Sequence, residues 1–301
     1  MGPLLKCVRP REREGRGARG RLTAVVSRKA PCPSPVPTEK LPDYQSPPVV
    51  EIIAAVQFVP LPQFGMAEAI TVARAFDEYS VVDVPPALPP IVEVRPGEPP
   101  RQSFRLDLGS PPVRLILSSQ DERWLVQIQQ DRIAVHERRV KNRPSFKHVR
   151  PQVGRVAKKA SAALGRELLG KAGHPPELVE LLYENRLPAG EGWKTLSELH
   201  KVLRLVAPPS KEPDISIDQV SVAFSSLLDS ADDFAGRLHV RAEPQVELQT
   251  NATQIHLQLI SHRYCRERAV TTVLNDCHRD IVEGFTAVAT RQMHRVWERY
   301  Q

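Results

Sequence analysis

The stretch "WLVQIQQDRIAVHERR", from Trp124 to Arg139, alternates apolar and polar residues, pauses at Gln130-Asp131, and then alternates again. A two-residue turn at that pause would oppose the flanking side chains in pairs: Ile128 with Ile133, Val126 with Val135, and Trp124 with Glu137. Alternation with a period of two and one apolar face predicts a half-buried antiparallel hairpin. A slip of one residue would turn the apolar side chains to the opposite face, so the register is strongly specified.

The two faces of this hairpin are expected to meet different surroundings. We expect its apolar face to pack under a helix that starts near Pro151, because proline is favoured in the first turn of a helix. The polar face carries Gln127, Gln129 and His136, and we expect it to look at solvent or into a groove. We therefore predict that the main role of the hairpin is to form part of the core, and that any role as a functional surface is secondary.

The charge of the chain is concentrated at its start. The protein has 301 residues and a formal net charge of +7. Residues 1–40 hold ten Lys/Arg and three Asp/Glu, which accounts for that +7, and they also hold six prolines. Such a segment buries too little apolar surface to offset its ordering entropy, so we predict a disordered basic arm over residues 1–45. The remainder, with 32 Lys/Arg and 32 Asp/Glu, is neutral and has a globular composition.

The compartment is inferred from targeting signals and cysteines. No run of 18 apolar residues is present, which argues against a membrane span, and the first residues lack the apolar stretch of a secretory signal. Four cysteines in a chain of 301 residues favour a reducing compartment over a disulfide framework. We therefore expect a cytoplasmic protein.

A weak internal repeat runs through the body at an offset of 129 residues. It aligns Val50-Glu51-Ile52-Ile53 with Val179-Glu180-Leu181-Leu182, and Phe64 with Trp193. Each of these aromatic residues opens a helical pattern. The predicted stripes are Met66, Ala69, Ile70, Ala73 and Phe76 in the first half, and Leu196, Leu199, Leu203 and Val206 in the second.

Each half continues with strands and one closing helix. In the first half we predict strands at 102–108, 112–118, 123–130 and 132–139, followed by the helix near Pro151. In the second half we predict strands at 215–228, 236–248 and 254–262, then one long helix from about Glu267 to Tyr300, roughly 50 Å in length. The fold class is α+β: two tandem related β-α-β-β-β(-β)-α units over residues 46–172 and 173–301, with antiparallel sheets each carrying a closing helix.

Four motifs resemble a sporadically distributed bacterial family of uncharacterised proteins. They are "SPPVVEIIAAVQF" at 46–58, the "LVQIQQDRIAVHERR" hairpin, "PELVELLYENRLP" at 176–188, and "LNDCHRDIVEGFTAVATRQMHRVWE" at 274–298. The chain departs from the family at His136-Glu137, where a tryptophan-containing tract is usual, and at Tyr183-Glu184-Asn185, where "YVN" is common. The resemblance covers residues 46–301 and implies a bacterial cytoplasmic protein without an established activity. It carries no catalytic residues to this chain.

No motif predicts a catalytic residue, a cofactor or a metal site. Cys265 and Cys277 lack the close spacing of a structural zinc site, and Cys277 lies on the apolar stripe of the last helix. His256 and His262 lie about 20 Å apart on one face of an extended strand, too far to share an ion. His239 could come near one of them across the hairpin, which we interpret as a chance arrangement.

The strongest local charge lies in residues 132–171, where twelve Lys/Arg face two Glu. The candidate binding residues are Arg138, Arg139, Lys141, Arg143, Lys147, Arg155, Lys158 and Lys159. We predict a non-enzymatic binding or adaptor protein that engages an acidic protein partner or a small ligand between the two halves; homo-oligomers are compatible with this. Two alternatives stay open: a nucleic-acid-associated protein that uses the basic region, and an enzyme with an unrecognised site.

Overall fold

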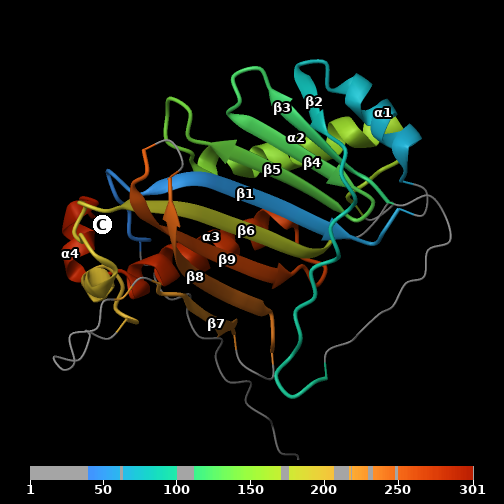
Figure 1. The fold of residues 1–301 in the computed structure, drawn as a ribbon. Helices are drawn as coiled ribbons and strands as arrows, with labels where there is room; N and C mark the ends of the chain where they lie inside the picture. The colour runs from blue at the N-terminus through green and yellow to red at the C-terminus, as the bar shows by residue number, and fades with distance from the viewer. Residues whose placement is uncertain are drawn as a thin grey trace, which may run out of the picture. The chain divides into compact units, whose positions relative to one another are not determined.

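Nine antiparallel strands form one continuous sheet in the order β2-β3-β4-β5-β1-β6-β9-β8-β7 (Figure 1). The computed structural model describes residues 40–61, 64–99, 112–170, 176–206, 217, 219–229, 233–247 and 250–300. The strands are Val49–Phe58 (β1), Tyr79–Asp83 (β2), Arg114–Ser119 (β3), Trp124–Gln129 (β4), Arg132–Arg138 (β5), Pro176–Pro188 (β6), Val222–Leu228 (β7), Gly236–Val246 (β8) and Thr253–Tyr264 (β9).

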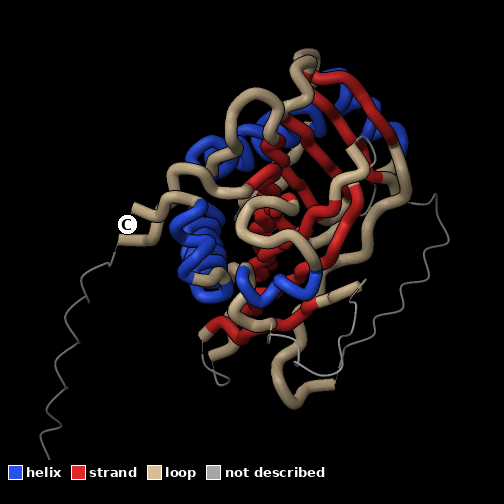
Figure 2. The backbone as a smooth tube through the Cα atoms, turned by 60° about the vertical axis from the view of Figure 1, so that its left-hand side comes forward, coloured by secondary structure: helices blue, strands red, loops and turns tan. Residues whose placement is uncertain are grey.

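The longer helices cover one face of this sheet (Figure 2). Helix α2 (Phe146–Leu164) packs on β5 and β1, and α3 (Val270–Val288) packs on β6 and β9. The shorter helices are α1 (Met66–Ala75), the 3-10 helix η1 (Leu196–Lys201) and α4 (Arg291–Val296). The α+β class is therefore confirmed. The sequence predicted a sheet for each half, but β1 pairs with β6 and joins all nine strands into one sheet.

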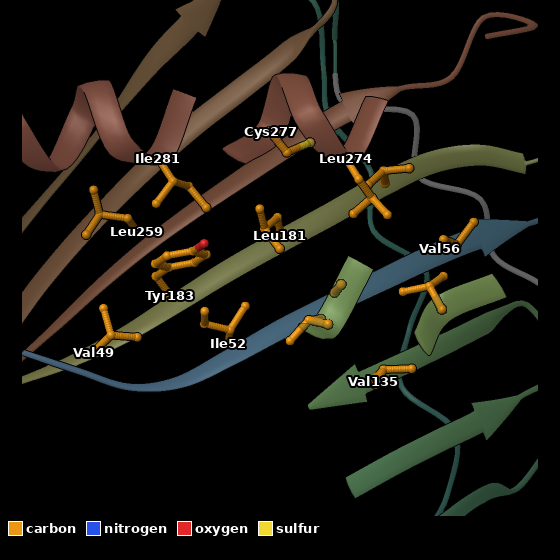
Figure 3. Packing of buried hydrophobic residues seen from close by; sticks show 14 of the residues in the cluster. Val49, Ile52, Val56, Val135, Leu181, Tyr183, Leu259, Leu274, Cys277 and Ile281 are labelled. Carbon is orange, nitrogen blue, oxygen red and sulfur yellow. The ribbon is translucent and has the colours of Figure 1, made fainter. Parts of the chain in front are cut away.

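The register of the hairpin is confirmed residue by residue. Strand β4 pairs with β5 so that Ile128 faces Ile133, Val126 faces Val135 and Trp124 faces Glu137. Ile128 and Ile133 have no exposed surface and belong to the core. The core continues between the sheet and α3, where side chains of β1, β6 and β9 meet those of the helix (Figure 3).

Helix α2 begins at Phe146, five residues before the predicted start near Pro151. The cause is Glu137, a carboxylate on the helix-covered face that has no exposed surface. It accepts a hydrogen bond from the Ser145 backbone N–H at 2.8 Å, contacts His148 Nδ1 at 3.0 Å, and is paired with Arg123 at 2.5 Å. A carboxylate at a helix N-terminus is favourable, so Glu137 fixes the first turn ahead of the proline.

The other predicted helices also differ from the structure. Of the stripe predicted in α1, Met66 and Ile70 are about half exposed, while Val72 is buried instead. The second stripe forms only η1, because the chain around Leu203 pairs with Ala289.

That same pairing divides the predicted long C-terminal helix in two. Arg204 N donates to Val288 O at 2.9 Å and Thr290 N donates to Val202 O at 3.0 Å, which holds Ala289 extended between α3 and α4. A single helix of roughly 50 Å is therefore wrong.

Several predictions fall on residues outside the described ones. The arm over residues 1–39, the strand at 102–108 and the first part of the strand at 215–228 are among them. Residues 40–45, assigned to the arm from sequence, lie against the body. Tyr44 forms a bridge with Arg299, and its hydroxyl lies 3.0 Å from His294 Nδ1. The Tyr300 N–H donates to Asp43 O at 3.1 Å, so both ends of the body are tied together.

The face of the sheet away from the helices is crossed by a segment that we call the strap, residues 88–94. In Figure 1 it is the teal chain that runs down across the strands after β2. Along the strap, successive residues form hydrogen bonds to successive strands of the sheet, in the order β4, β5, β1, β9 and β8. The pairs are Leu88 with Gln129, Pro89 with Arg132, Ile91 with Gln57, Glu93 with His262, and Val94 with Arg237. A proline-rich chain has no internal backbone hydrogen bonds, so polar side chains of the sheet supply its partners.

The strap corrects the expectation for the polar face of the hairpin. Gln129 is 2% exposed, and its side-chain amide both accepts from the Leu88 N–H at 3.1 Å and donates to the Leu88 carbonyl at 3.0 Å. His136 is also buried, between Gln127 and Glu51. Neither side chain looks at solvent, because the strap and its neighbours occupy that side.

We expect Ile128→Ala to lower the free energy of unfolding by about 2–5 kcal/mol, because it deletes buried methylene groups and leaves a cavity in the core. Chemical denaturation of the purified variant measures the loss. A change below about 1 kcal/mol would contradict the assignment of this side chain to the core.

We expect Gln129→Ala to lower the free energy of unfolding by about 1–3 kcal/mol, because both backbone groups of Leu88 and the buried carboxylate of Asp131 then lose the partner that the Gln129 amide supplies. Gln127→Ala is the matched control, since Gln127 lies on the same face and contacts His136 instead of the strap. It should cost about 1 kcal/mol or less. Equal losses for the two variants would argue against the strap as the cause.

Candidate functional site

A pocket of about 560 Å³ lies between the helix-covered face of the sheet and α3. Its floor comes from β1, β6 and β9, and its roof from α3, as the side chains of Ile52, Tyr183, Leu259 and Ile281 show in Figure 3. Two segments form the rim, residues 40–47 and residues 143–147. A largely apolar concavity with a few polar groups is typical of small-molecule sites.

His278 and Tyr183 form the first polar pair in the pocket. The Tyr183 hydroxyl lies 3.0 Å from His278 Nδ1, and the ring of Phe146 stacks on the imidazole at 4.2 Å between centroids. Burial lowers the pKa of His278 to about 4, only partly opposed by the charge of Asp43. Burial, with the charge of Glu137, raises the pKa of Tyr183. Both side chains are therefore neutral near pH 7, and the pair offers hydrogen bonds without charge.

Asn185 is the second polar group, and it is unsatisfied. It lies within β6, three residues before the strand ends, is 1% exposed and lines the pocket. Its Nδ2 donates to the backbone carbonyls of Tyr183 at 3.3 Å and Leu257 at 3.0 Å. These two bonds orient the amide, and Oδ1 has no hydrogen-bond partner among the described residues. A buried acceptor without a donor costs free energy, so its presence beside a cavity requires an explanation.

Half of the basic residues predicted as a binding surface are engaged in contacts within the body. Four of them make contacts within the body: Arg138 pairs with Glu51, Arg139 donates to Pro47 O, Arg143 donates to Tyr44 O and Gln45 O, and Lys159 pairs with Glu78. The others, Lys141, Lys147, Arg155 and Lys158, are exposed. Only Arg143 and Lys147 reach the pocket, where they lie on its rim.

A second polar cluster lies on the other face, under the strap. Glu93 Oε1 is 2.6 Å from both His239 Nε2 and His262 Nδ1, and Glu93 Oε2 is 3.0 Å from Arg237 Nε. The far nitrogen of His262, Nε2, lies 2.7 Å from Glu180 Oε2. Burial disfavours the charged forms of His262 and Glu93. The two carboxylates nevertheless raise the pKa of His262 to about 9, and the two histidines lower the pKa of Glu93 to about 2.

Sequence reasoning missed the central residue of each cluster. His239 and His262 pair across the β8–β9 hairpin, which the spacing allowed, but Glu93 arrives from a proline-rich connection 146 residues before His239. Asn185 sits within a motif quoted for its family resemblance, and nothing in its spacing marks it as unsatisfied. No pattern of neighbouring residues encodes either arrangement.

No protein-family model matches this chain, and no curated protein does. Within the described residues, none of the helices combines the length and the apolar character that crossing a bilayer needs.

We expect the stability of the protein to fall as the pH drops below the ordinary His value of 6.5, through the pKa of about 4 that burial gives His278. The folded state holds His278 neutral, so the unfolded chain binds the extra proton first and acid favours unfolding. The expected loss is on the order of 2–3 kcal/mol by the end of this interval, and no loss from this group is expected above pH 6.5.

His278→Gln is the matched variant, because glutamine can keep a hydrogen bond to Tyr183 and does not titrate. Chemical denaturation of both proteins at a series of pH values gives the comparison. The acid-dependent loss should be smaller in the variant by the amount above, and parallel curves would contradict the buried neutral histidine.

Proposed function

We propose that this protein binds a small, mostly apolar organic acid in the pocket between the sheet and α3. The observation that carries the proposal is the buried, partnerless Oδ1 of Asn185 at the pocket wall. A ligand with a hydroxyl, amide or amine donor would satisfy that acceptor. Recovering an otherwise unmade buried hydrogen bond is worth about 1–3 kcal/mol, which gives the ligand one fixed point inside an apolar cavity.

The acidic character of the ligand is inferred from the rim. Lys40, Arg143 and Lys147 line the pocket, against the single carboxylate of Asp43. Lys147 is exposed and free to move toward a bound anion, whereas Arg143 already donates to the backbone of residues 44 and 45. An anionic group at this rim would remain partly hydrated, and its attraction to the lysines would be weakened by salt.

The apolar body of the ligand would lie deeper, between Ile52 on β1 and Ile281 and Phe285 on α3. A volume of about 560 Å³ falls within the range of drug-sized ligand sites. The neutral pair of Tyr183 and His278 adds hydrogen-bonding capacity without the cost of a buried charge. These features support binding; an enzyme with an unrecognised site remains an alternative.

The nucleic-acid alternative has weaker support. Of the eight candidate basic residues, four are engaged within the body, and their opposite charges or carbonyl partners reduce the field available to phosphates. An acidic protein partner would meet the same limit. Either of these partners would depend on Lys141, Arg155 and Lys158, which do not line the pocket.

The test uses 1-anilinonaphthalene-8-sulfonate, whose sulfonate, secondary amine and aromatic rings match the three regions of the pocket. We expect saturable fluorescence with one site per chain. Asn185→Leu should weaken binding about 10-fold, because it removes the buried acceptor that has no partner among the described residues and is offered to the amine. Ile281→Trp should abolish binding by filling the cavity.

Two lysines on helix α2 provide the matched controls. Lys147→Glu, on the rim, should weaken binding and reduce its dependence on salt. Lys158→Glu, three turns further along the same helix and outside the pocket, should leave binding unchanged. If Lys158→Glu weakened binding as much as Lys147→Glu, or if Ile281→Trp bound normally, the dye would be reporting another surface and the proposal would fail.

We also propose that the two halves arose by internal duplication, as the sequence offset of 129 residues predicts. Two observations support it. Each half runs from a central strand to a meander that returns beside that strand, and then to a helix on the same face of the sheet. In addition, Ile53 pairs directly with Leu182, and these are equivalent positions at an offset of 129. Superposition of the first half, residues 46–172, on the second, residues 173–301, tests this relation, and central strands and closing helices that fail to coincide at an offset of 129 would contradict it.

A further inference from the structure

The cluster under the strap has the composition of a metal site. Glu93, His239 and His262 place one carboxylate oxygen and two imidazole nitrogens within 4.8 Å of one another. The three side chains come from the strap, β8 and β9, so the fold brings them together from three separate segments. Two imidazoles and a carboxylate are a ligand set that zinc accepts with a fourth position left open.

The outer partners of the two histidines are a second, independent observation. The far nitrogen of His262 lies 2.7 Å from Glu180 Oε2, and the far nitrogen of His239 lies 2.7 Å from Ser225 Oγ. Histidines that bind metals usually donate their other N–H to such an oxygen, which fixes the ring and raises the basicity of the ligating nitrogen. Both rings are thus presented to the cluster in the orientation that a metal requires.

We propose that Glu93, His239 and His262 bind a divalent first-row transition metal, zinc foremost, which fastens the strap to the sheet. The ligand atoms now lie at hydrogen-bond distance, 2.6 Å from Glu93 Oε1 to each histidine. Ligand atoms around tetrahedral zinc are roughly 3.3 Å apart, so each histidine nitrogen needs to move away from Glu93 Oε1 by less than about 1 Å. The metal takes the place of the protons that bridge these atoms when no ion is bound.

The charges near the cluster are compatible with a dication. Glu93 and Glu180 bring two negative charges and Arg237 one positive charge. With both histidines neutral, the cluster is negative by one unit before the ion arrives. Arg237 is held by the Glu93 oxygen that the histidines do not touch and by the carbonyl of Val94, so it orients the carboxylate from outside.

The same strand supplies a matched control. His256 lies on the same face of β9 as His262 and is also paired with a carboxylate, Glu184, at 3.3 Å. Among the described residues it has Glu184 as its ion-pair partner and belongs to no group of three possible metal ligands. Substitution of His256 therefore removes an equally placed imidazole without removing a ligand.

The test is a titration of the full chain with cobalt(II), followed by visible absorption, and then displacement of cobalt by zinc. We expect one equivalent to produce the intense visible bands of four-coordinate cobalt, without the near-ultraviolet charge-transfer band that cysteine ligands give. His239→Ala and His262→Ala should each weaken binding at least 100-fold, and His256→Ala should leave it unchanged. Ser225→Ala should weaken it about 10-fold, the size of an outer-partner effect.

Hydrogen exchange of residues 88–94 supplies a second measurement. Zinc should slow exchange of the Leu88 and Ile91 amides in the native chain and in His256→Ala, and should have no effect in His239→Ala. Two results would overturn the proposal: the native chain binds no stoichiometric cobalt, or the His239→Ala and His262→Ala variants bind cobalt as tightly as the native chain does. The cluster would then hold the strap by hydrogen bonds alone. Should either alanine variant fail to fold, Ser225→Ala, at the exposed edge strand, decides the question alone.

Discussion

The pairing of β1 with β6 is the interaction on which the rest of the structure depends. These strands lie at the centre of the sheet, one from each half of the chain, and their ladder runs from Val49 to Phe58. Without it, each half would be a small sheet with an open edge, and an open edge is prone to pairing with other chains. With it, α2 and α3 lie on the same face of one sheet and share one core. The pocket lies in that shared layer, beside the two central strands.

The second constraint is that both faces of the sheet are occupied. Helices cover the apolar face, while the opposite face is lined with amides, histidines, arginines and glutamates that hold the strap. Polar side chains on a covered face are stable only when their hydrogen bonds are made, and the backbone of a proline-rich strap needs partners of its own. The sheet side chains and the strap backbone therefore supply each other's hydrogen-bond partners. The metal that we propose would add to a contact that already follows this logic.

Local sequence patterns predicted the parts of the fold that depend on local contacts. The hairpin of β4 and β5 was predicted with its register, because alternation and a two-residue turn define it within 16 residues. The predictions failed where a distant segment decides the structure. The chain at Val202 interrupts the last helix, and the strap buries Gln129. In each of these places the residue pattern was compatible with the prediction, and a contact from far along the chain overrode it.

The candidate sites also depend on contacts between residues that are distant in the sequence. Runs of basic residues are visible in a sequence, yet half of the eight predicted residues turned out to be engaged with carboxylates or carbonyls that their spacing does not reveal. Asn185 is the central residue of the pocket and Glu93 that of the cluster under the strap. The importance of each residue depends on side chains and backbone groups that are near it in space and distant in the sequence. The Asn185 amide is oriented by its bonds to the carbonyls of Tyr183 on its own strand and Leu257 on β9, and no donor among the described residues reaches its Oδ1. Glu93 becomes a hub because the strap delivers it to two histidines.

The joining of the two ends of the body has a consequence for how the protein is made. Residues 40–47 line the pocket, and they are held by residues 297–300 through the Tyr44–Arg299 bridge and the hydrogen bonds around it. During synthesis the ribosome releases residue 44 long before residue 299, so the early segment has no partner until translation of the body is nearly over. The strands can form as they emerge, but the rim of the pocket closes last. A nascent chain of this protein therefore completes the rim of the pocket only after α4 has left the ribosome.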